Sequence, residues 1–462
     1  MLLLAVTALY VGSASCTPCH AEIAAAYAKT AMARSSGRVA EEPPQGRFRA
    51  AGQDYEIAGT RLGFAAGSAS LDFFIGSNTA GRSFLTEREG YLYELPVTWY
   101  ARQQRWDASP GYEKDSWVRL NRAVEPGCLG CHASRVRPVY GTQNRYGSPP
   151  FLDGGVSCER CHGPGSEHVR DPVAARMVNP AKLDGDQRDS VCSQCHLTGE
   201  VRVNRPGRQF AMFRAGELLQ DYATYFVRPG PGLKVTSHVE RLAASRCKRS
   251  SGDALWCGTC HDVHTGADRT QQACLGCHAV AHRQSERCAD CHMPRTPTTD
   301  GNHGAMTDHG IVRRPGAAAE RAALTVFLGT ADDRAWGLAY AETGSPLARE
   351  YLLRGQPADA AVLLRLAVLE PDRVRAAKLY EAVLRTEPAQ VTALVNLGAI
   401  YAEQERTAAA AKLWERALEA NPAIEGAVLN LARISKPETA RALLRRYLEF
   451  NPASPAARRG IR

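Results

Sequence analysis

Seven copies of the pattern Cys-x-x-Cys-His occur in the 462-residue chain. They are Cys16, Cys19 and His20; Cys128, Cys131 and His132; Cys158, Cys161 and His162; Cys192, Cys195 and His196; Cys257, Cys260 and His261; Cys274, Cys277 and His278; and Cys288, Cys291 and His292. In this pattern the two thiols form thioethers with porphyrin vinyl groups, and the adjacent imidazole becomes an axial ligand of the iron. The sequence therefore predicts seven covalently attached hemes c, with these histidines as proximal ligands.

Structural zinc is the main alternative explanation for paired cysteines. Zinc sites use four ligands, commonly two Cys-x-x-Cys pairs, so seven pairs would leave one unmatched. Neither zinc nor a disulfide framework gives a reason for a histidine after every second cysteine. Heme attachment accounts for all three residues of each motif.

Six further histidines could supply distal ligands: His168, His238, His264, His282, His303 and His309. None of the thirteen histidines lies in residues 316–462, a distribution that favours iron ligation over incidental surface positions. If all six bind iron, six hemes become bis-histidine. The seventh iron then takes another ligand or stays open.

Met32 is the first candidate for that position, because it lies one short helix beyond His20. A thioether ligand would raise the potential of that heme, whereas the simpler reading makes Met32 a packed apolar residue. Met306 is a weaker candidate, and an open iron would permit substrate chemistry. Cys247, the fifteenth cysteine, predicts a buried inert thiol, with iron ligation or a reactive thiol as the alternative. No catalytic residue can be assigned.

The formal charge of +9 first suggests an acidic partner or nucleic acid. Each heme, however, brings two propionates, which would offset much of the excess. We therefore expect Lys and Arg to neutralise propionates, and we expect no nucleic-acid partner.

Residues 1–15 are apolar with small residues near the end, as in a secretory signal peptide; the stretch is short and lacks a basic start, as a truncated signal would. Covalent heme attachment takes place outside the cytoplasmic membrane, so a periplasmic or otherwise extracytoplasmic location is expected. No later run reaches the roughly 18 apolar residues of a membrane span, so none is expected in the mature chain.

The motifs define a heptaheme cytochrome c domain over residues 16–315, rich in loops, with a short helix expected at each motif. Residues 48–117 lack cysteine and read as a small strand-rich insertion, whose expected role is to cover heme edges. Within it, alternating apolar and polar residues predict a β-hairpin over Ser83–Tyr100, with Gly90 at the turn.

After residue 315 the composition turns to Ala, Leu, Arg and Glu, which marks a domain boundary. A period of 34 residues appears there: Ala376, Leu379, Tyr380 and Pro388 recur as Ala410, Leu413, Trp414 and Pro422. This spacing predicts tetratricopeptide (TPR) helical hairpins that stack into a solenoid over 316–462, with Gly398 where paired helices approach. The predicted fold class is mainly α: a loop-rich multiheme cytochrome c domain with a small β insertion, followed by an all-α TPR solenoid.

Several segments carry a family resemblance: Gly90-Tyr-Leu-Tyr-Glu-Leu-Pro, Trp106-Asp-Ala-Ser-Pro-Gly-Tyr, Val178-Asn-Pro-Ala-Lys, Val191-Cys-Ser-Gln-Cys-His and Cys260-His-Asp-Val-His. Together they resemble bacterial multiheme cytochromes c with C-terminal TPR repeats, related to the tetraheme cytochrome c of nitrifying bacteria and to the hydroxylamine oxidoreductase superfamily. The resemblance implies heme at all seven motifs and distal roles for His168, His264, His282 and His309. Related chains often have His where this one has Met32, which puts bis-histidine ligation of heme 1 in doubt.

Two functions follow from these patterns. Bis-histidine irons pass electrons but do not bind substrates, so a relay of closely spaced hemes would serve as an electron carrier. The alternative is an oxidoreductase acting on a small nitrogen or sulfur compound at the one heme that lacks a distal histidine. Because six of seven irons can be saturated, the sequence favours electron transfer, with the TPR repeats docking a redox partner protein or acting as a structural cap.

Overall fold

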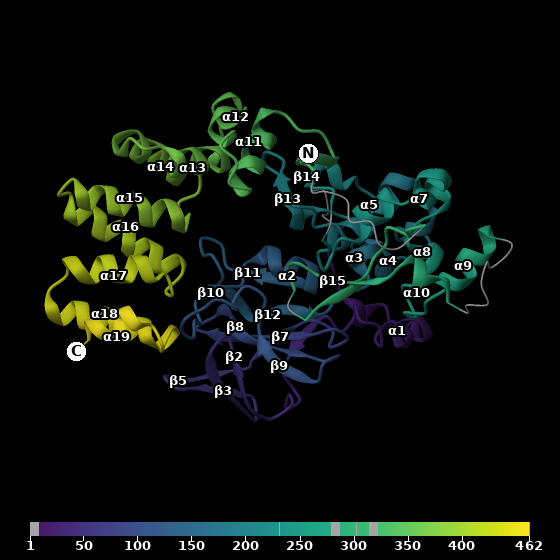
Figure 1. Ribbon diagram of the computed structural model, residues 1–462, viewed down its shortest axis with the longest axis horizontal. Helices are drawn as coiled ribbons and strands as arrows, with labels where there is room; N and C mark the ends of the chain where they lie inside the picture. The colour runs from purple at the N-terminus through teal and green to yellow at the C-terminus, as the bar shows by residue number, and fades with distance from the viewer. Residues whose placement is uncertain (1–8, 231, 279–286, 302, 314–321, 462) are drawn as a thin grey trace.

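The structure is a computed structural model of the chain and describes residues 9–230, 232–278, 287–301, 303–313 and 322–461. Figure 1 shows a β-rich part below, a part of short helices and loops to the right, and a column of helices to the left. The Cys-x-x-Cys-His motifs lie in the second part and along its border with the first. Among the described residues, no helix combines the length and the apolar character that crossing a bilayer would require.

The β-rich part consists of two antiparallel sheets. The first has the order β1-β6-β7-β8-β10 with β9 on β8: β1 (Ser36–Arg38), β6 (Phe73–Ile75), β7 (Arg82–Arg88), β8 (Tyr91–Tyr100), β10 (Arg122–Ala123) and β9 (Arg105–Ala108). The second is a meander of β2 (Gly46–Ala50), β3 (Gln53–Ala58), β4 (Arg61–Phe64) and β5 (Gly67–Ser70). Leu62, Phe84, Leu95 and Trp106 are among the side chains that form a shared core between the sheets.

The hairpin predicted from alternating residues is confirmed as β7 and β8, which pair from Arg88 opposite Tyr91. Its turn contains Glu89 and Gly90, both at positive φ, as a tight two-residue hairpin turn requires. The hairpin centre is buried on both faces, since the second sheet covers one side and the motif-bearing part covers the other.

The motif-bearing part is built from short helices: α1 (Ala21–Tyr27), α2 (Pro126–His132), α3 (Glu159–His162), α4 (Ser166–Arg170), α5 (Gly185–His196), α6 (His238–Ala244), α7 (Arg246–Ser251), α8 (Cys257–Cys260), α9 (Thr270–Cys277) and α10 (Cys288–His292). Single 3-10 turns join them: η1 (Ser13–Ser15), η2 (Pro180–Lys182), η3 (Phe210–Met212), η4 (Leu219–Asp221) and η5 (Gly252–Ala254). Six motifs lie on or directly beside these helices as expected, while the first forms the turn that leads into α1.

Three smaller sheets run through the same part. They pair β11 (Ala133–Pro138) with β12 (Tyr146–Gly154), β15 (Arg295–Pro297) with β16 (Ala305–Thr307), and β13 (Val201–Asn204) with β14 (Ala223–Val227) and β17 (Thr325–Leu328). Strands make up 20% of the chain against 41% for helices, so the expected mainly α fold with one small β insertion needs correction. Sheets frame the motif region on several sides.

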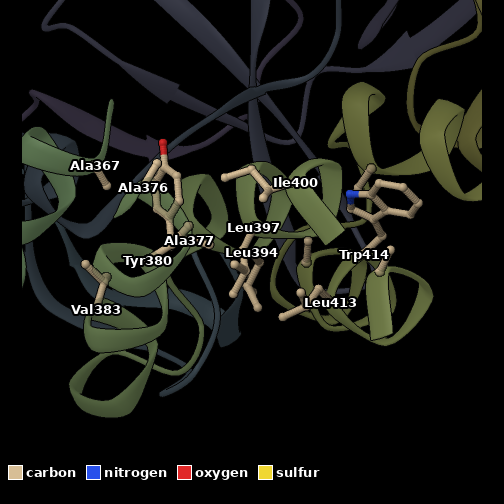
Figure 2. Close-up of a cluster of buried hydrophobic side chains, with 14 of the residues drawn as sticks. Ala367, Ala376, Ala377, Tyr380, Val383, Leu394, Leu397, Ile400, Leu413 and Trp414 are labelled. Carbon is tan, nitrogen blue, oxygen red and sulfur yellow. The ribbon is translucent and has the colours of Figure 1, made fainter. Parts of the chain in front are cut away.

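The helical column comprises α11 (Asp333–Glu342), α12 (Ala348–Arg354), α13 (Ala360–Leu369), α14 (Arg373–Thr386), α15 (Val391–Glu403), α16 (Thr407–Ala420), α17 (Glu425–Ile434), α18 (Pro437–Phe450) and α19 (Pro455–Gly460). Consecutive helices stack side by side (Figure 1). Figure 2 shows their interior, where Tyr380, Leu397 and Trp414 belong to one buried cluster. A Cβ on Gly398 would lie 2.5 Å from the Trp414 indole nitrogen, so a glycine is required where α15 and α16 meet.

The column is attached to the rest of the molecule at both ends. At its start, Ala335 and Ala339 of α11 pack against Val203 and Phe226 of the β13-β14-β17 sheet. At its end, the turn after α16 reaches the β7–β8 hairpin, and the turn after α18 reaches the segment that leads into β10. There the Tyr93 hydroxyl donates to Asn421 Oδ1 over 2.9 Å, and the Leu120 amide donates to Asn451 Oδ1 over 3.1 Å.

Candidate heme sites

One cavity of 2440 Å³ lies in the motif-bearing part, with mostly apolar walls. Pockets for one small organic ligand commonly measure about 300–1,000 Å³, so this cavity has room for several such groups. Cysteines from six of the seven motifs line it, whereas Cys128, Cys131 and His132 of the second motif do not. An apolar space bordered by attachment thiols is the environment that porphyrin rings require.

Ten histidines line the same cavity: His20, His162, His168, His196, His238, His261, His264, His278, His292 and His309. Six belong to motifs, and four come from the set that the sequence proposed as distal ligands. The structure therefore brings His168, His238, His264 and His309 to the motifs, over separations of up to 148 residues in the case of His168 and His20.

Three pairs of these imidazoles have the spacing that one iron between them would need. A metal–imidazole bond is about 2 Å long, so rings on opposite sides of one metal have centroids about 6 Å apart. The centroids of His20 and His168 are 6.4 Å apart, those of His162 and His264 are 6.0 Å apart, and those of His261 and His309 are 6.2 Å apart. The first two pairs are also nearly parallel, at 17° and 11°.

Four histidines in the cavity have one ring nitrogen bonded to a backbone carbonyl. Nδ1 of His162 lies 2.7 Å from the Val178 carbonyl oxygen, and Nδ1 of His168 lies 2.7 Å from that of Ala175. Nδ1 of His292 lies 2.7 Å from the Val312 carbonyl oxygen, and Nδ1 of His309 lies 2.9 Å from that of Thr307. A carbonyl only accepts, so Nδ1 carries the proton and Nε2 keeps its lone pair. Metal-binding histidines are oriented in this way, with the outer nitrogen donating and the inner nitrogen ligating.

Burial keeps several of these imidazoles neutral. Removal from water lowers the pKa of His132, His162, His196 and His309 below the ordinary value. Burial together with the neighbouring His196 and His309 lowers the pKa of His238 to about 3. Because iron binds the neutral imidazole, these residues need not lose a proton before ligation.

His238 differs from the three pairs with centroids about 6 Å apart. Its ring lies 5.1 Å from His196, nearly perpendicular, and 4.7 Å from His309. Its Nδ1 is buried without a hydrogen-bond partner among the described residues. The rings of His196, His238 and His309 thus form one group, and His309 also faces His261. This group joins the fourth motif, which contains His196, to the fifth, which contains His261.

His303 does not reach the cavity. Its Nε2 lies 2.8 Å from Asp107 Oδ2, and its ring packs edge-on against Tyr100, with centroids 4.9 Å apart. These contacts join the loop before β16 to the β-rich part. His282 lies outside the described residues.

Met32 and Met306 both line the cavity, but the ring opposite His20 is that of His168. Within the described chain, no ring contact links His132 or His278 to another histidine. For the irons expected at the second and sixth motifs, the described residues thus place no histidine opposite His132 or His278.

Thiols of different motifs lie beside each other. The pairs are Cys16 with Cys158, Cys131 with Cys195, Cys192 with Cys257, and Cys274 with Cys288. None of the cysteines forms a disulfide in the described chain, and Cys247 lines the cavity next to Cys274. Among the residues that the structure describes, no three His, Cys, Asp or Glu side chains converge on a point that could hold a metal ion. Each thiol pair joins two neighbouring motifs.

Residues inside two motifs also tie the motifs together. Arg160, between Cys158 and Cys161, donates through a guanidinium nitrogen to the Gly130 carbonyl of the second motif over 2.9 Å. Gln194, between Cys192 and Cys195, donates to the Arg160 carbonyl over 3.2 Å. Neither side chain was predicted to bridge motifs. Their polar character at the variable positions was the only available signal.

Basic side chains line the cavity in excess over acidic ones: Arg102, Arg176, Arg246, Lys248, Arg287, Arg295 and Arg313 against Asp186, Asp189, Asp262, Asp268 and Asp290. Lys248 Nζ is committed to Asp189, 3.1 Å away. Arg287 is likewise paired with Asp290, 3.4 Å away. The excess of basic over acidic side chains in the lining would neutralise heme propionates. This fits the expected use of the net positive charge.

Comparisons with known proteins agree with this chemistry. Residues 101–163, which contain the second and third motifs, match the family model described as cytochrome c554 and c-prime. The multiheme cytochrome MtrA of Shewanella baltica (strain OS185) is 26% identical over 176 residues, which cover 33% of this chain and 52% of that protein. The chain thus spans about half the length of that relative. The crystal structure of the outer cell wall cytochrome OcwA aligns with 91% of this chain and 99% of its own, at 15% identity and a TM-score of 0.45.

Proposed function

We propose that this multiheme c-type cytochrome carries electrons through seven covalently bound hemes outside the cytoplasm. The observation that carries the proposal is the set of three imidazole pairs spaced about 6 Å apart, as two bonds to one metal require. An iron with two histidine ligands has no position for a substrate, so it exchanges electrons only.

We infer the order of the hemes in the relay from the thiols that neighbour one another. Cys16 is hydrogen-bonded to Cys158, Cys192 to Cys257 and Cys274 to Cys288, which connects hemes 1 with 3, 4 with 5 and 6 with 7. Electrostatic interactions of Cys161 with Cys192 and of Cys260 with Cys274 place heme 3 near heme 4 and heme 5 near heme 6. Heme 2 joins heme 4 through Cys131 and Cys195. The resulting path is a line with one side branch, and its hemes are held at their vinyl edges.

Ligation of the hemes follows from the ring pairs. We assign His168, His264 and His309 as the distal ligands of hemes 1, 3 and 5, and His238 as that of heme 4. Met32 is then not needed for heme 1. His282 remains the proposed partner of one of the last two hemes, and His303 is the weakest candidate because Asp107 holds it.

The helical column would serve as the docking site for a redox partner protein, as the TPR pattern suggests. Its attachment at both ends supports a fixed orientation toward the hemes. A signal segment before the first motif would direct the chain to the periplasm or another extracytoplasmic compartment, where the hemes are attached.

Mass spectrometry and spectroscopy of the natively matured protein test the proposal together. The intact mass should exceed that of the polypeptide by seven hemes, and electron paramagnetic resonance should show mainly low-spin ferric iron. An unmodified mass, or bound zinc without a Soret band, would contradict heme attachment.

Within the described chain, no histidine lies opposite His132 or His278. This absence favours a second candidate function, that of an oxidoreductase. A heme with an open position would reduce or oxidise a small nitrogen or sulfur compound. A high-spin ferric signal that shifts on addition of nitrite, hydroxylamine or sulfite would support this oxidoreductase function. Wholly low-spin iron would exclude it.

A further inference from the structure

Glu159 is a buried carboxylate inside the third motif, between Cys158 and Cys161, with 1% of its surface exposed. It accepts three hydrogen bonds from backbone amides. Val11 N lies 2.9 Å and Gly165 N lies 2.7 Å from Oε1, and Gly12 N lies 2.7 Å from Oε2. A buried carboxylate that accepts several amides fixes all the segments that donate to it.

Two of these donors belong to the segment that carries the first motif. Gly12 directly precedes η1, and η1 leads into Cys16 and His20. The same contact region brings the Cys16 thiol beside Cys158. The Cys158 amide is also bonded to Ser13 Oγ, over 3.2 Å. The proximal side of heme 1 is thus anchored to the third motif through Glu159 and its neighbours.

The third donor belongs to the segment that carries the opposing ring. Gly165 is the N-cap residue of α4, and His168 lies on α4 one turn later. His168 faces His20 with 6.4 Å between ring centroids. One carboxylate therefore holds the start of both chain segments whose imidazoles would sandwich the first iron.

We propose that Glu159 is a positioning residue that sets the spacing of His20 and His168 around heme 1. The inference rests on the proposed function, since it requires a heme at the first motif. Its role is local, because Glu159 bonds to the segments that carry His20 and His168. In the described part of the chain, it makes no such bond to the segments of His261 and His309. The positioning role also requires that Val11 and Gly12 remain in the mature protein, so any signal cleavage must fall before Val11 and not at residue 15, where the predicted signal segment ends.

The test uses the mature, heme-loaded protein with Glu159→Ala, the isosteric Glu159→Gln, and Thr17→Ala as the matched control. Thr17 occupies the same first variable position of its motif, is exposed, and bonds only to the nearby Ser13 carbonyl. We expect Glu159→Ala to keep seven hemes by mass while one low-spin signal becomes high-spin or changes its axial anisotropy. Glu159→Gln should show a smaller change, since one amide oxygen replaces two carboxylate oxygens, and Thr17→Ala should show none.

The outcomes separate the two proposals. Seven hemes with an unchanged spectrum in Glu159→Ala overturn the positioning role and leave the relay intact, whereas a parent protein without hemes overturns the proposed function. A purely structural role would lower stability and perturb all hemes equally, which also contradicts the inference. If Glu159→Ala does not accumulate, a protein that begins at Ser13 behind a foreign signal peptide removes two donors instead. It should give the same single-heme change, and an unaltered spectrum, or a native N-terminus beyond Gly12, overturns the proposal.

Discussion

Single histidines decide what each iron can do, because a second imidazole closes the iron to substrates. The bonds from Nδ1 of His162 and His168 to backbone carbonyls leave Nε2 directed to the metal side. Met32 drew attention in the sequence because related chains have histidine there. The structure instead sets His168 opposite His20, a contact that sequence distance alone does not reveal.

His264→Ala should convert one heme from low-spin to high-spin ferric iron, because it removes the ring that faces His162 at 6.0 Å. Electron paramagnetic resonance and the Soret maximum of the oxidised protein measure the change. His303→Ala is the matched control, since its ring is bonded to Asp107 outside the cavity. Equal spectral changes in the two variants would refute the assignment of His264.

Glu94 gives the protein a pH-dependent stability. Burial raises the pKa of this carboxyl to about 7, against the opposing effect of Arg122, whose guanidinium lies 3.3 Å away. The folded state binds the proton more tightly than the unfolded chain, whose glutamate pKa is about 4.3. The stabilising contribution is complete below that pH and is lost as pH rises through 7.

Glu94→Gln should therefore remove a decline in unfolding free energy of about 1–3 kcal/mol between pH 4.5 and 7.5. Urea unfolding followed by circular dichroism at several pH values measures this difference. Glu56→Gln on β3 is the control, because its side chain is 48% exposed. A parallel pH dependence in the parent and Glu94→Gln would disprove the contribution of Glu94.

At the scale of elements, the short helices were predictable because each motif fixes a turn of chain with two thiols and an imidazole on one side. The hairpin β7–β8 was predictable from alternation and the Glu89-Gly90 turn. The small sheets β11–β12, β13-β14-β17 and β15–β16 were missed. The strands β11 and β12 do not alternate between buried and exposed residues, and β15 and β16 have three residues each. Strand β17 pairs with β14, which lies far earlier in the chain. The bridging roles of Arg160 and Gln194 were also missed, because they depend on how motifs meet in space.

In the helical column, Gly398→Ala should destabilise the protein by about 1–3 kcal/mol, the usual effect of overpacking a filled core. The added Cβ would meet the Trp414 ring, which is fully buried and bonded to the Val395 carbonyl. Gly426→Ala is the matched control, since a Cβ there lies 3.7 Å from the Val395 side chain and favours helix. The midpoint of thermal unfolding of the protein measures this destabilisation. An unchanged midpoint for Gly398→Ala would contradict close packing of α15 and α16.

At the scale of the whole molecule, the column is bound to the β-rich part through the turns after α16 and α18. Asn421 and Asn451 are fully buried there. The side chain of Asn421 bonds to Tyr93 and Gln143. That of Asn451 bonds to the Leu120 amide and to Tyr447 of α18. Both asparagines precede a proline of the helical repeat, so the sequence indicated a turn but not what the turn touches. Tyr91, Tyr93, Ala423 and Phe450 complete the contact as an apolar cluster.

The double variant Asn421→Ala and Asn451→Ala should release the column, because each change leaves buried polar partners unsatisfied at about 1–3 kcal/mol. Limited proteolysis and small-angle scattering should report an extended molecule whose heme spectrum is unchanged. Arg446→Gln is the control, because its ion pair with Glu89 is exposed and contributes less than about 1 kcal/mol. Equal protease resistance of the double variant and the parent would argue against this attachment.

The contact between Tyr93 and Asn421 joins residues 328 positions apart, with six of the seven heme motifs between them in the sequence. During synthesis the tyrosine edge of β8 therefore emerges long before the residues that cover it. A chain that stops short of residue 421 could receive all its hemes and still present bare aromatic rings to proteases. Packing of the turns after α16 and α18 against the β-rich part would thus distinguish a complete polypeptide from a truncated one.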